Sequence, residues 1–291
     1  MAAVATEARS VERALPPFRL SPGRIFQYAV LIVVALAILG PILTAVFGGF
    51  KTTGELFVEP FGIPRVFRWE NYTDVLSSPL FWRGLGNSGI IVFGTVSLTV
   101  ICSSLLAFVF SRLQFRGREL LFNFFTLGLL FPITIAFLPV FIQVKQLSLI
   151  DSYFGVILPL VAFGIPSSTL ILRGFFRGIP SELEDAAYID GCGTMGFFWY
   201  VLLPLARPAL GAIVVLQTIV AWNDYFLSLI VLTDDSKWPL TLGIMQFQGQ
   251  YGTDWARVMA YISILIVPAV LFYIFTQRYI VTGLTGGELK G

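Results

Sequence analysis

PSELEDAAYIDGCGTMGFFWYVLLPLARP, residues 180–208, differs in character from the sequence on either side of it. The stretch begins acidic, passes through paired alanines to a glycine, and ends in an aromatic and aliphatic run that stops at Leu203-Pro204. It lies between the fourth and fifth of the chain's apolar runs, in the longest non-membrane interval that follows the fourth run, 173–207. A chain embedded in lipid rarely keeps so many ordered-looking residues in water unless another protein docks there. The stretch therefore predicts a docking element between membrane spans.

The first half of the stretch has the pattern of a short helix. Ser181 followed by Glu184 predicts a capping box, in which each side chain binds a backbone amide of the first turn. Gly191 is expected to end this helix, because a left-handed residue is needed there. Ala186 and Ala187 leave one face of the helix shallow, which favours close approach by a groove of another protein.

A second short helix is expected after the glycine. Thr194 is predicted to cap it, and the helix is predicted to run through Leu203. Pro204 would then end it, because proline lacks an N–H and its ring blocks the preceding helical turn. The pattern as a whole predicts two short helices around a glycine corner.

This stretch resembles the EAA signature of the inner-membrane subunits of ATP-binding-cassette importers, which reads EAA, three residues, G, nine residues and I-x-L-P. Here Asp185-Ala186-Ala187, Gly191 and Val201-Leu202-Leu203-Pro204 match it with the spacing intact, with Asp for Glu and Val for Ile. Asp190-Gly191 and Leu203-Pro204-Leu205 resemble the sugar-importing branch. The C-terminal residues, Gln277-Arg278 and then 283–291, resemble the tail of the maltose-type second permease.

The resemblance implies that the stretch couples this chain to a separate ATPase. The residues that it assigns to this coupling are Glu184, Asp185, Ala186, Ala187, Asp190, Gly191, Leu203 and Pro204. It also implies that the tail, with Gly286, Gly287 and Lys290, reaches the interface between two ATPase subunits. The other implied partners are a second permease subunit, which forms a heterodimer with this chain, an extracytoplasmic solute-binding protein and a sugar. ATP and magnesium would bind the ATPase, so no cofactor is expected in this chain.

The composition predicts an all-α, polytopic membrane protein. Of the 291 residues, 56% are hydrophobic and 12% are charged, against about 25% charged in a soluble domain. A span needs about 20 apolar residues. The runs that meet this requirement are Ile25–Phe47, Ser88–Phe110, Leu120–Val144, Phe154–Leu172, Ala209–Leu232 and Val258–Gln277. We expect a cytoplasmic extension at 1–24, a six-helix permease domain at 25–281 that contains the signature at 180–208, and a cytoplasmic tail at 282–291.

The distribution of Lys and Arg predicts the orientation of the spans, because cytoplasmic loops carry the excess of these residues. With the N-terminus inside, twelve of the 19 Lys and Arg residues fall on the cytoplasmic side, including the cluster 112–118. Both termini and the signature are then cytoplasmic, in a bacterial cell membrane. The net charge of +2 reflects this asymmetry, and no basic patch for nucleic acid is apparent.

Several kinds of chemistry are excluded by the sequence. It contains no histidine, which excludes a Ser-His-Asp triad and an H-E-x-x-H metal site. It also contains no G-x-x-x-x-G-K-[ST] phosphate loop. We therefore expect a transport subunit and not an enzyme, with ATP hydrolysis in a partner.

Asp224 is the one ionisable residue well inside an expected span. Such residues are costly in lipid and are often functional. With Trp222, Asn223 and Tyr225 it offers ring faces and polar groups suited to a sugar, so this stretch is a candidate for the substrate pathway. A structural role, as an interhelical hydrogen bond or a helix end near the interface, is the alternative.

The expected outer loops, 48–87 and 233–257, are long and aromatic. They suit either docking of a solute-binding protein or anchoring at the lipid headgroups. We expect the permease subunit of an importer of a di- or oligosaccharide. A glycerol-phosphate or polyol cargo is the alternative within the same class. A secondary transporter would need coupling carboxylates or inverted repeats, and an intramembrane enzyme would need paired catalytic groups. The sequence does not name the sugar.

Overall fold

The computed structural model describes residues 22–249 and 252–285. The chain divides into two compact units, Met1–Thr44 and Ala45–Gly291. The apolar helix α1 runs from Pro22 to Gly49. Its residues 22–44 are the described part of the first unit, and its last residues, 45–49, belong to the second. Most of the expected extension 1–24 lies outside the described residues.

The second unit is helical apart from one small hairpin. Its elements are α2 (Thr53–Val58), α3 (Glu70–Ser77), α4 (Pro79–Arg112), α5 (Arg118–Thr126), η1 (Leu127–Leu130), α6 (Ile133–Gln146), α7 (Tyr153–Gly178), α8 (Glu182–Ile189), α9 (Thr194–Phe197), η2 (Phe198–Leu202), α10 (Leu203–Leu205), α11 (Arg207–Trp222), α12 (Phe226–Val231), η3 (Asp235–Lys237), η4 (Leu240–Phe247), β1 (Gln248–Gly249), β2 (Gly252–Thr253) and α13 (Trp255–Thr285). Strands β1 and β2 pair antiparallel.

The all-α, multi-pass fold expected from the sequence is confirmed. Among the described residues four helices, α1, α4, α7 and α13, are long and apolar enough to cross a membrane. Two bent helix pairs are also long and apolar enough to cross a membrane when each pair is taken as one segment. They are α5–η1 with α6, bent by 101°, and α9–α10 with α11, bent by 75°. Counting each pair as one span brings the total to six, but the second pair takes in residues 194–205 of the signature stretch and shares only α11 with the expected fifth span.

The third and fifth expected spans are not continuous helices. Leu120–Val144 is broken at Pro132, which follows an extended residue, Phe131, as proline requires of the residue before it. Ala209–Leu232 is interrupted at Asn223–Tyr225, between α11 and α12. Apolar residues continue through both breaks, so hydropathy alone predicted uninterrupted helices.

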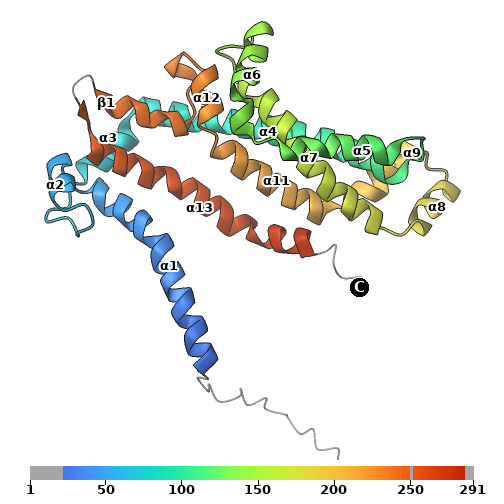
Figure 1. Ribbon diagram of the computed structural model, residues 1–291, viewed down its shortest axis with the longest axis horizontal. Coiled ribbons are helices and arrows are strands. Elements are labelled where there is room, and N and C mark those ends of the chain that lie inside the picture. Colours follow the sequence, from blue (N-terminus) through green and yellow to red (C-terminus); the bar gives the residue numbers. More distant parts are fainter. Residues whose placement is uncertain (1–21, 250–251, 286–291) are drawn as a thin grey trace, which may run out of the picture. The chain divides into compact units, whose positions relative to one another are not determined.

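The core of the second unit is formed where α4, α7 and α11 pack along one another, with α13 beside α11 (Figure 1). Small residues let these helices approach closely. A Cβ on Gly94 would lie 2.7 Å from Ile157, and a Cβ on Gly164 would lie 2.6 Å from the Gln217 Oε1 atom. A side chain at either position would require the end of the facing Ile157 or Gln217 side chain to shift.

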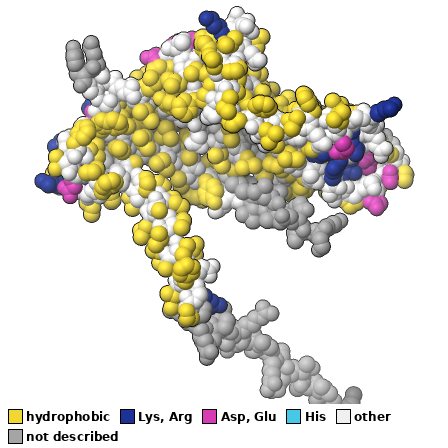
Figure 2. All heavy atoms as spheres, in the orientation of Figure 1, with side chains coloured by type: hydrophobic (Ala, Val, Ile, Leu, Met, Phe, Trp, Pro, Cys, Tyr) yellow, Lys and Arg dark blue, Asp and Glu magenta, His cyan; other side chains and the backbone are white. Residues whose placement is uncertain are grey.

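The signature residues and the aromatic loops lie at opposite ends of this packed unit. Helices α8 and α9 occupy one end, whereas α3 and the β1 hairpin lie at the other (Figure 1). On the face drawn in Figure 2, charged side chains gather over α5 and α8, while hydrophobic side chains cover most of the middle. This separation agrees with the two sides of a membrane that the sequence predicts.

Candidate functional site

Helix α8 ends as the sequence predicts. Gly191 has a φ of +83°, in the left-handed region. Its N–H donates to the Tyr188 carbonyl at 3.1 Å, and the Cys192 N–H donates to the Ala187 carbonyl at 2.9 Å. This pair of bonds is the Schellman motif, which satisfies carbonyls that the last helical turn leaves free. Glycine is needed here because an L side chain is strained at positive φ.

The capping box expected at Ser181 and Glu184 is wrong. Ser181 has a helical backbone, with φ of −70° and ψ of −23°, and its side chain makes no capping hydrogen bond among the described residues. A capping side chain needs an extended backbone to reach the amides of the next turn. The Glu184 carboxylate instead lies 3.3 Å from Arg112 and accepts the Tyr188 hydroxyl at 3.1 Å.

The second short helix is present, but the Thr194 cap expected for it is wrong and it does not end where expected. Helix α9 starts at Thr194, with Gly193 as its N-cap and no side-chain cap among the described residues. The helix then widens into a π turn, η2, and runs through Pro204 to Leu205. A widened turn accommodates the proline, which has no N–H to donate. The chain bends at Ala206 instead, into α11.

Arg112, the last residue of α4, fastens the signature segment (residues 180–208) to the membrane helices. One guanidinium nitrogen donates to the carbonyls of Phe176, at 2.6 Å, and Ile179, at 2.7 Å, at the end of α7. The other reaches Glu184 of α8, and the guanidinium carbon lies 5.8 Å from the ring centre of Phe197. The Arg112 side chain is only 9% exposed. Its fork therefore joins α4, α7, α8 and α9 at one point.

Arg173 makes the reciprocal connection from α7 back to α4. Its Nε donates to the Phe110 carbonyl at 3.1 Å, and its terminal nitrogen contacts both Glu119 oxygens at 2.6 Å. It also stacks 3.6 Å from the ring centre of Phe122. Arg177 adds a second ion pair to Glu119 at 2.6 Å. The start of α5 is thereby tied to α7, and α4 and α7 are each bound to the other's last turn.

Beneath the segment lies a continuous apolar core. Phe197, Phe198 and Leu202 are fully buried against Phe108 of α4 and Phe176 of α7. Ala187 also faces this core, so of the two alanines only Ala186 lies on the free face. The other exposed side chains of the segment are acidic and aromatic or aliphatic, and include Glu182, Asp185, Ile189, Asp190, Met195, Trp199 and Tyr200. Leu203 and Pro204 are half-buried. The segment is thus held on one side and open to a partner on the other.

The four candidate substrate residues divide into two pairs. Trp222 and Asn223 line a cavity of about 350 Å³, together with Gly89 and Val92 of α4 and Phe272 of α13. Asp224 and Tyr225 are not among its lining residues. The Asp224 carboxylate instead accepts the Ser228 N–H at 3.0 Å and the Ser228 hydroxyl at 2.7 Å. Asp224 therefore stabilises the first turn of α12, as the structural alternative expects.

The tail residues Gly286, Gly287 and Lys290 lie outside the described residues. Arg112, Arg173 and Glu119, by contrast, are functional candidates that the sequence pattern did not identify. Both arginines belong to the twelve Lys and Arg residues that the predicted orientation places on the cytoplasmic side. Their position at the last turn of a span, beside free carbonyls, was the available signal.

The sequence is similar to a known protein family and to several known transport proteins. The family model described as "Binding-protein-dependent transport system inner membrane component" matches residues 99–283. The diacetylchitobiose uptake system permease protein NgcG of Streptomyces coelicolor is 32% identical over 91% of this chain and 88% of that protein. The arabinooligosaccharides transport system permease protein AraQ of Bacillus subtilis is 31% identical over 88% and 92%.

A solved structure has the same fold. It is the crystal structure of a bacterial ABC transporter involved in the import of the acidic polysaccharide alginate, with a TM-score of 0.76 and 26% identity. The similarity covers 91% of this chain and 99% of that chain. A second alginate transporter structure, bound to a periplasmic protein carrying an alginate pentasaccharide, has a TM-score of 0.62 at 14% identity and supports the fold alone.

Proposed function

The chain belongs to the family of binding-protein-dependent transport system inner membrane components, and from this premise we propose that it forms half of the pathway of a sugar importer. The cargo would be a di- or oligosaccharide. Diacetylchitobiose and arabino-oligosaccharides are named for two relatives, and alginate for the solved structure. A glycerol-phosphate or polyol cargo is the second candidate, and one relative is named for sulfoquinovosyl glycerol.

We propose that the signature segment couples this chain to a separate ATPase, which binds ATP and magnesium. The observation that carries this proposal is the fastening of the segment by Arg112 on one side and its free face on the other. A displacement of the segment by the ATPase would be transmitted to α4 and α7 together, because Arg112 joins these helices. The residues involved would be Glu184, Asp185, Ala186, Ala187, Asp190, Gly191, Leu203 and Pro204, with Glu184 and Ala187 acting from the fastened side.

The remaining assembly is proposed from the same family membership. It would hold a second permease subunit, two ATPase subunits and an extracytoplasmic solute-binding protein that docks on the aromatic outer loops. The orientation would place both termini and the signature segment in the cytoplasm. The permease domain would then be residues 25–281, and the tail 282–291, with Gly286, Gly287 and Lys290, would reach the ATPase interface.

One experiment tests the proposed function directly. The chain is purified from native membranes in mild detergent, its partners are identified, and the complex is placed in lipid vesicles for uptake of diacetylchitobiose and arabino-oligosaccharides. An ATPase is expected to co-purify, and uptake is expected to require ATP. Uptake driven by an ion gradient without any ATPase would identify a secondary transporter and reject the proposal.

Asp224→Asn is expected to leave the complex assembled and to change transport modestly. The amide oxygen can still accept from Ser228, so only a charge is lost, and we expect about a threefold to tenfold change in the half-saturating sugar concentration. The measurement is concentration-dependent uptake in vesicles. Ser228→Ala is the matched control, because it removes one bond to the carboxylate while the charge stays. Unchanged kinetics in Asp224→Asn would assign the residue to α12 alone.

A further inference from the structure

Helix α12 is too short to hold its own position. It has six residues, whereas isolated helices shorter than about 12–15 residues are marginal in water. It also follows the break at Asn223–Tyr225, so α11 does not continue into it. Something outside α12 must therefore fix each of its ends. Asp224 holds the first turn through Ser228.

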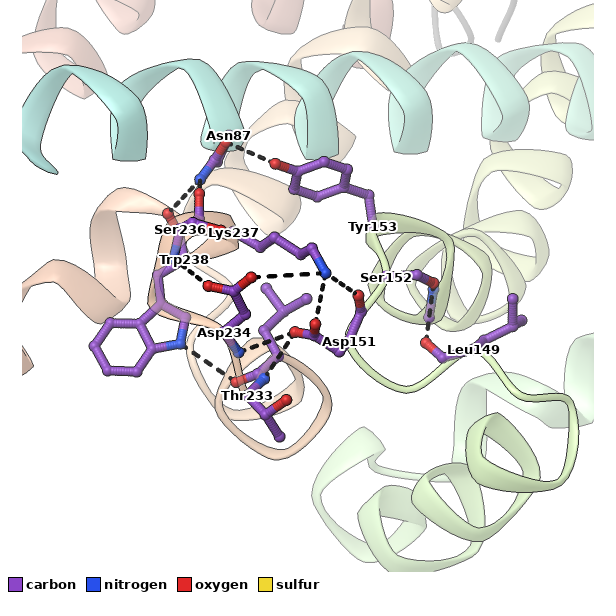
Figure 3. Close-up of polar contacts among 12 residues, drawn as sticks. Asn87, Leu149, Asp151, Ser152, Tyr153, Thr233, Asp234, Ser236, Lys237 and Trp238 are labelled. Carbon is purple, nitrogen blue, oxygen red and sulfur yellow. Dashed lines mark hydrogen bonds and ion pairs between the residues drawn. The ribbon is translucent and has the colours of Figure 1, made fainter.

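Asp151, in the turn before α7, holds the other end. Its N–H donates to the Val231 carbonyl at 2.9 Å, the last residue of α12. Its Oδ1 accepts the N–H groups of Thr233, at 3.1 Å, and Asp234, at 3.0 Å. Asp151 has a φ of +58°, a conformation that aspartate tolerates better than most residues. One side chain thus binds the backbone on the far side of the helix end, as Figure 3 shows.

Lys237 completes this arrangement from η3. Its Nζ donates to Asp151 Oδ2 at 2.5 Å and to the Asp151 carbonyl at 2.8 Å, and Asp234 lies 4.0 Å away (Figure 3). The two side chains of the pair are 33% and 26% exposed, for Lys237 and Asp151. The pair therefore joins the turn before α7 to η3, the element that follows α12.

Hydrogen bonds connect the residues on either side of the pair to the long helices α4 and α7. Asn87 of α4 donates to the carbonyls of Ser236, at 2.9 Å, and Trp238, at 3.0 Å, and accepts the Tyr153 hydroxyl of α7 at 2.8 Å (Figure 3). Gly155 leaves no room beside it, because a Cβ there would lie 2.3 Å from the Leu149 carbonyl oxygen and 2.8 Å from Val231. The seat of α12 against α7 is consequently close and specific.

The pair stays ionised across the physiological range. The Lys237 hydrogen bond, followed by that from the Asp234 N–H, lowers the pKa of Asp151 to about 2. Because this folded-state pKa lies below the usual value of about 3.9, the stabilisation is present above about pH 4 and is lost as the pH falls towards 2. Substitution, and not mild acid, is therefore the means to open the pair.

We propose that Asp151 and Lys237 form an outer lock, a pair of positioning residues that seats α12 against α7. Through α12 the lock sets the place of the polar break at Asn223–Tyr225, beside the cavity that Trp222 and Asn223 line. Its effect on transport rests on the proposed function, whereas its effect on α12 does not.

The test uses Asp151→Asn and Lys237→Met in the purified complex in vesicles. Amide hydrogen exchange in residues 226–233 is expected to rise about tenfold, the response to about 1.4 kcal/mol of lost local stabilisation. Exchange in α8 should not change. For diacetylchitobiose and arabino-oligosaccharide uptake, the half-saturating concentration should rise about threefold to tenfold while the maximal rate changes by less than about twofold.

Arg257→Met is the matched control, because Arg257 pairs with Asp74 at 2.7 Å, also across an outer contact, but does not touch α12. It should leave exchange in 226–233 as in the parent. Unchanged exchange there in both lock variants, or an equal rise in the control, overturns the lock. A fall in maximal rate with unchanged half-saturation overturns the positioning role. If no complex transports either probe, the proposed function fails while the exchange measurement still decides the lock.

Discussion

Arg112→Met is expected to abolish uptake while the membrane helices remain folded. The change removes the side-chain donor of the Ile179 carbonyl and the cationic partner of the Glu184 carboxylate. The Phe176 carbonyl also loses Arg112 but still accepts the Ile179 N–H. An unpaired buried acceptor costs about 1–3 kcal/mol, and breaking a buried ion pair costs about 3–5 kcal/mol. Helix α8 should therefore detach from α4 and α7. The measurements are ATP-driven uptake in vesicles and amide exchange in residues 182–189.

Two variants make this result specific. Arg112→Lys keeps the charge but replaces the planar guanidinium with a compact ammonium group, which cannot donate to all of the same acceptors. Partial uptake is therefore expected. Arg118→Met removes a neighbouring, more exposed arginine that pairs with Glu119, and uptake should stay near the parent level because surface ion pairs contribute little. Parent uptake in Arg112→Met would show that the fork does not carry the coupling.

Gly191→Pro is expected to eliminate uptake with the complex weakened at the ATPase contact. Proline fixes φ near −65°, whereas Gly191 has a φ of +83°. Proline also removes the N–H that donates to the Tyr188 carbonyl, so the cost should be about 3 kcal/mol or more. The last turn of α8 should open, and the free face should lose its shape. Uptake and the amount of ATPase that co-purifies are the measurements.

Alanine variants separate the backbone effect from crowding. A Cβ on either Gly191 or Gly193 would meet open space. Gly193 has a φ of −80°, so Gly193→Ala should be close to neutral. Gly191→Ala should lose about 1–2 kcal/mol, the cost of a left-handed residue, and retain part of the uptake. If Gly191→Pro transports like Gly193→Ala, the Schellman turn is not needed for coupling.

Local sequence signals predicted those features whose cause is local. Gly191 ends α8 because only glycine takes its backbone conformation without strain, and no distant residue is needed to make that choice. Apolar length predicted a multi-pass helical chain for the same reason. Pro132 marked the break in the third expected span, although the apolar run concealed it.

Features that depend on distant residues could not be predicted in this way. The capping box failed because Ser181 has a helical backbone, and the Glu184 carboxylate pairs instead with Arg112, 72 residues earlier. The uninterrupted fifth span expected around Asp224 is wrong, because α11 ends at Trp222, before the aspartate. The outer lock joins residues 86 positions apart. Each of these contacts is set by helix packing, which a single sequence does not specify.

The reciprocal arginines also order the biosynthesis of this chain. Arg112 must wait for the Phe176 carbonyl, which lies 64 residues later. At synthesis rates of about 5–20 residues per second, this delay is roughly 3–13 s. During that time the newly inserted α4 ends in an arginine without its α7 partners, and the start of α5 lacks the guanidinium of Arg173. Insertion of α7 would release both helices from this incomplete state at once. The emergence of residues 173–179 from the ribosome is thus the step that supplies both arginine connections between α4 and α7.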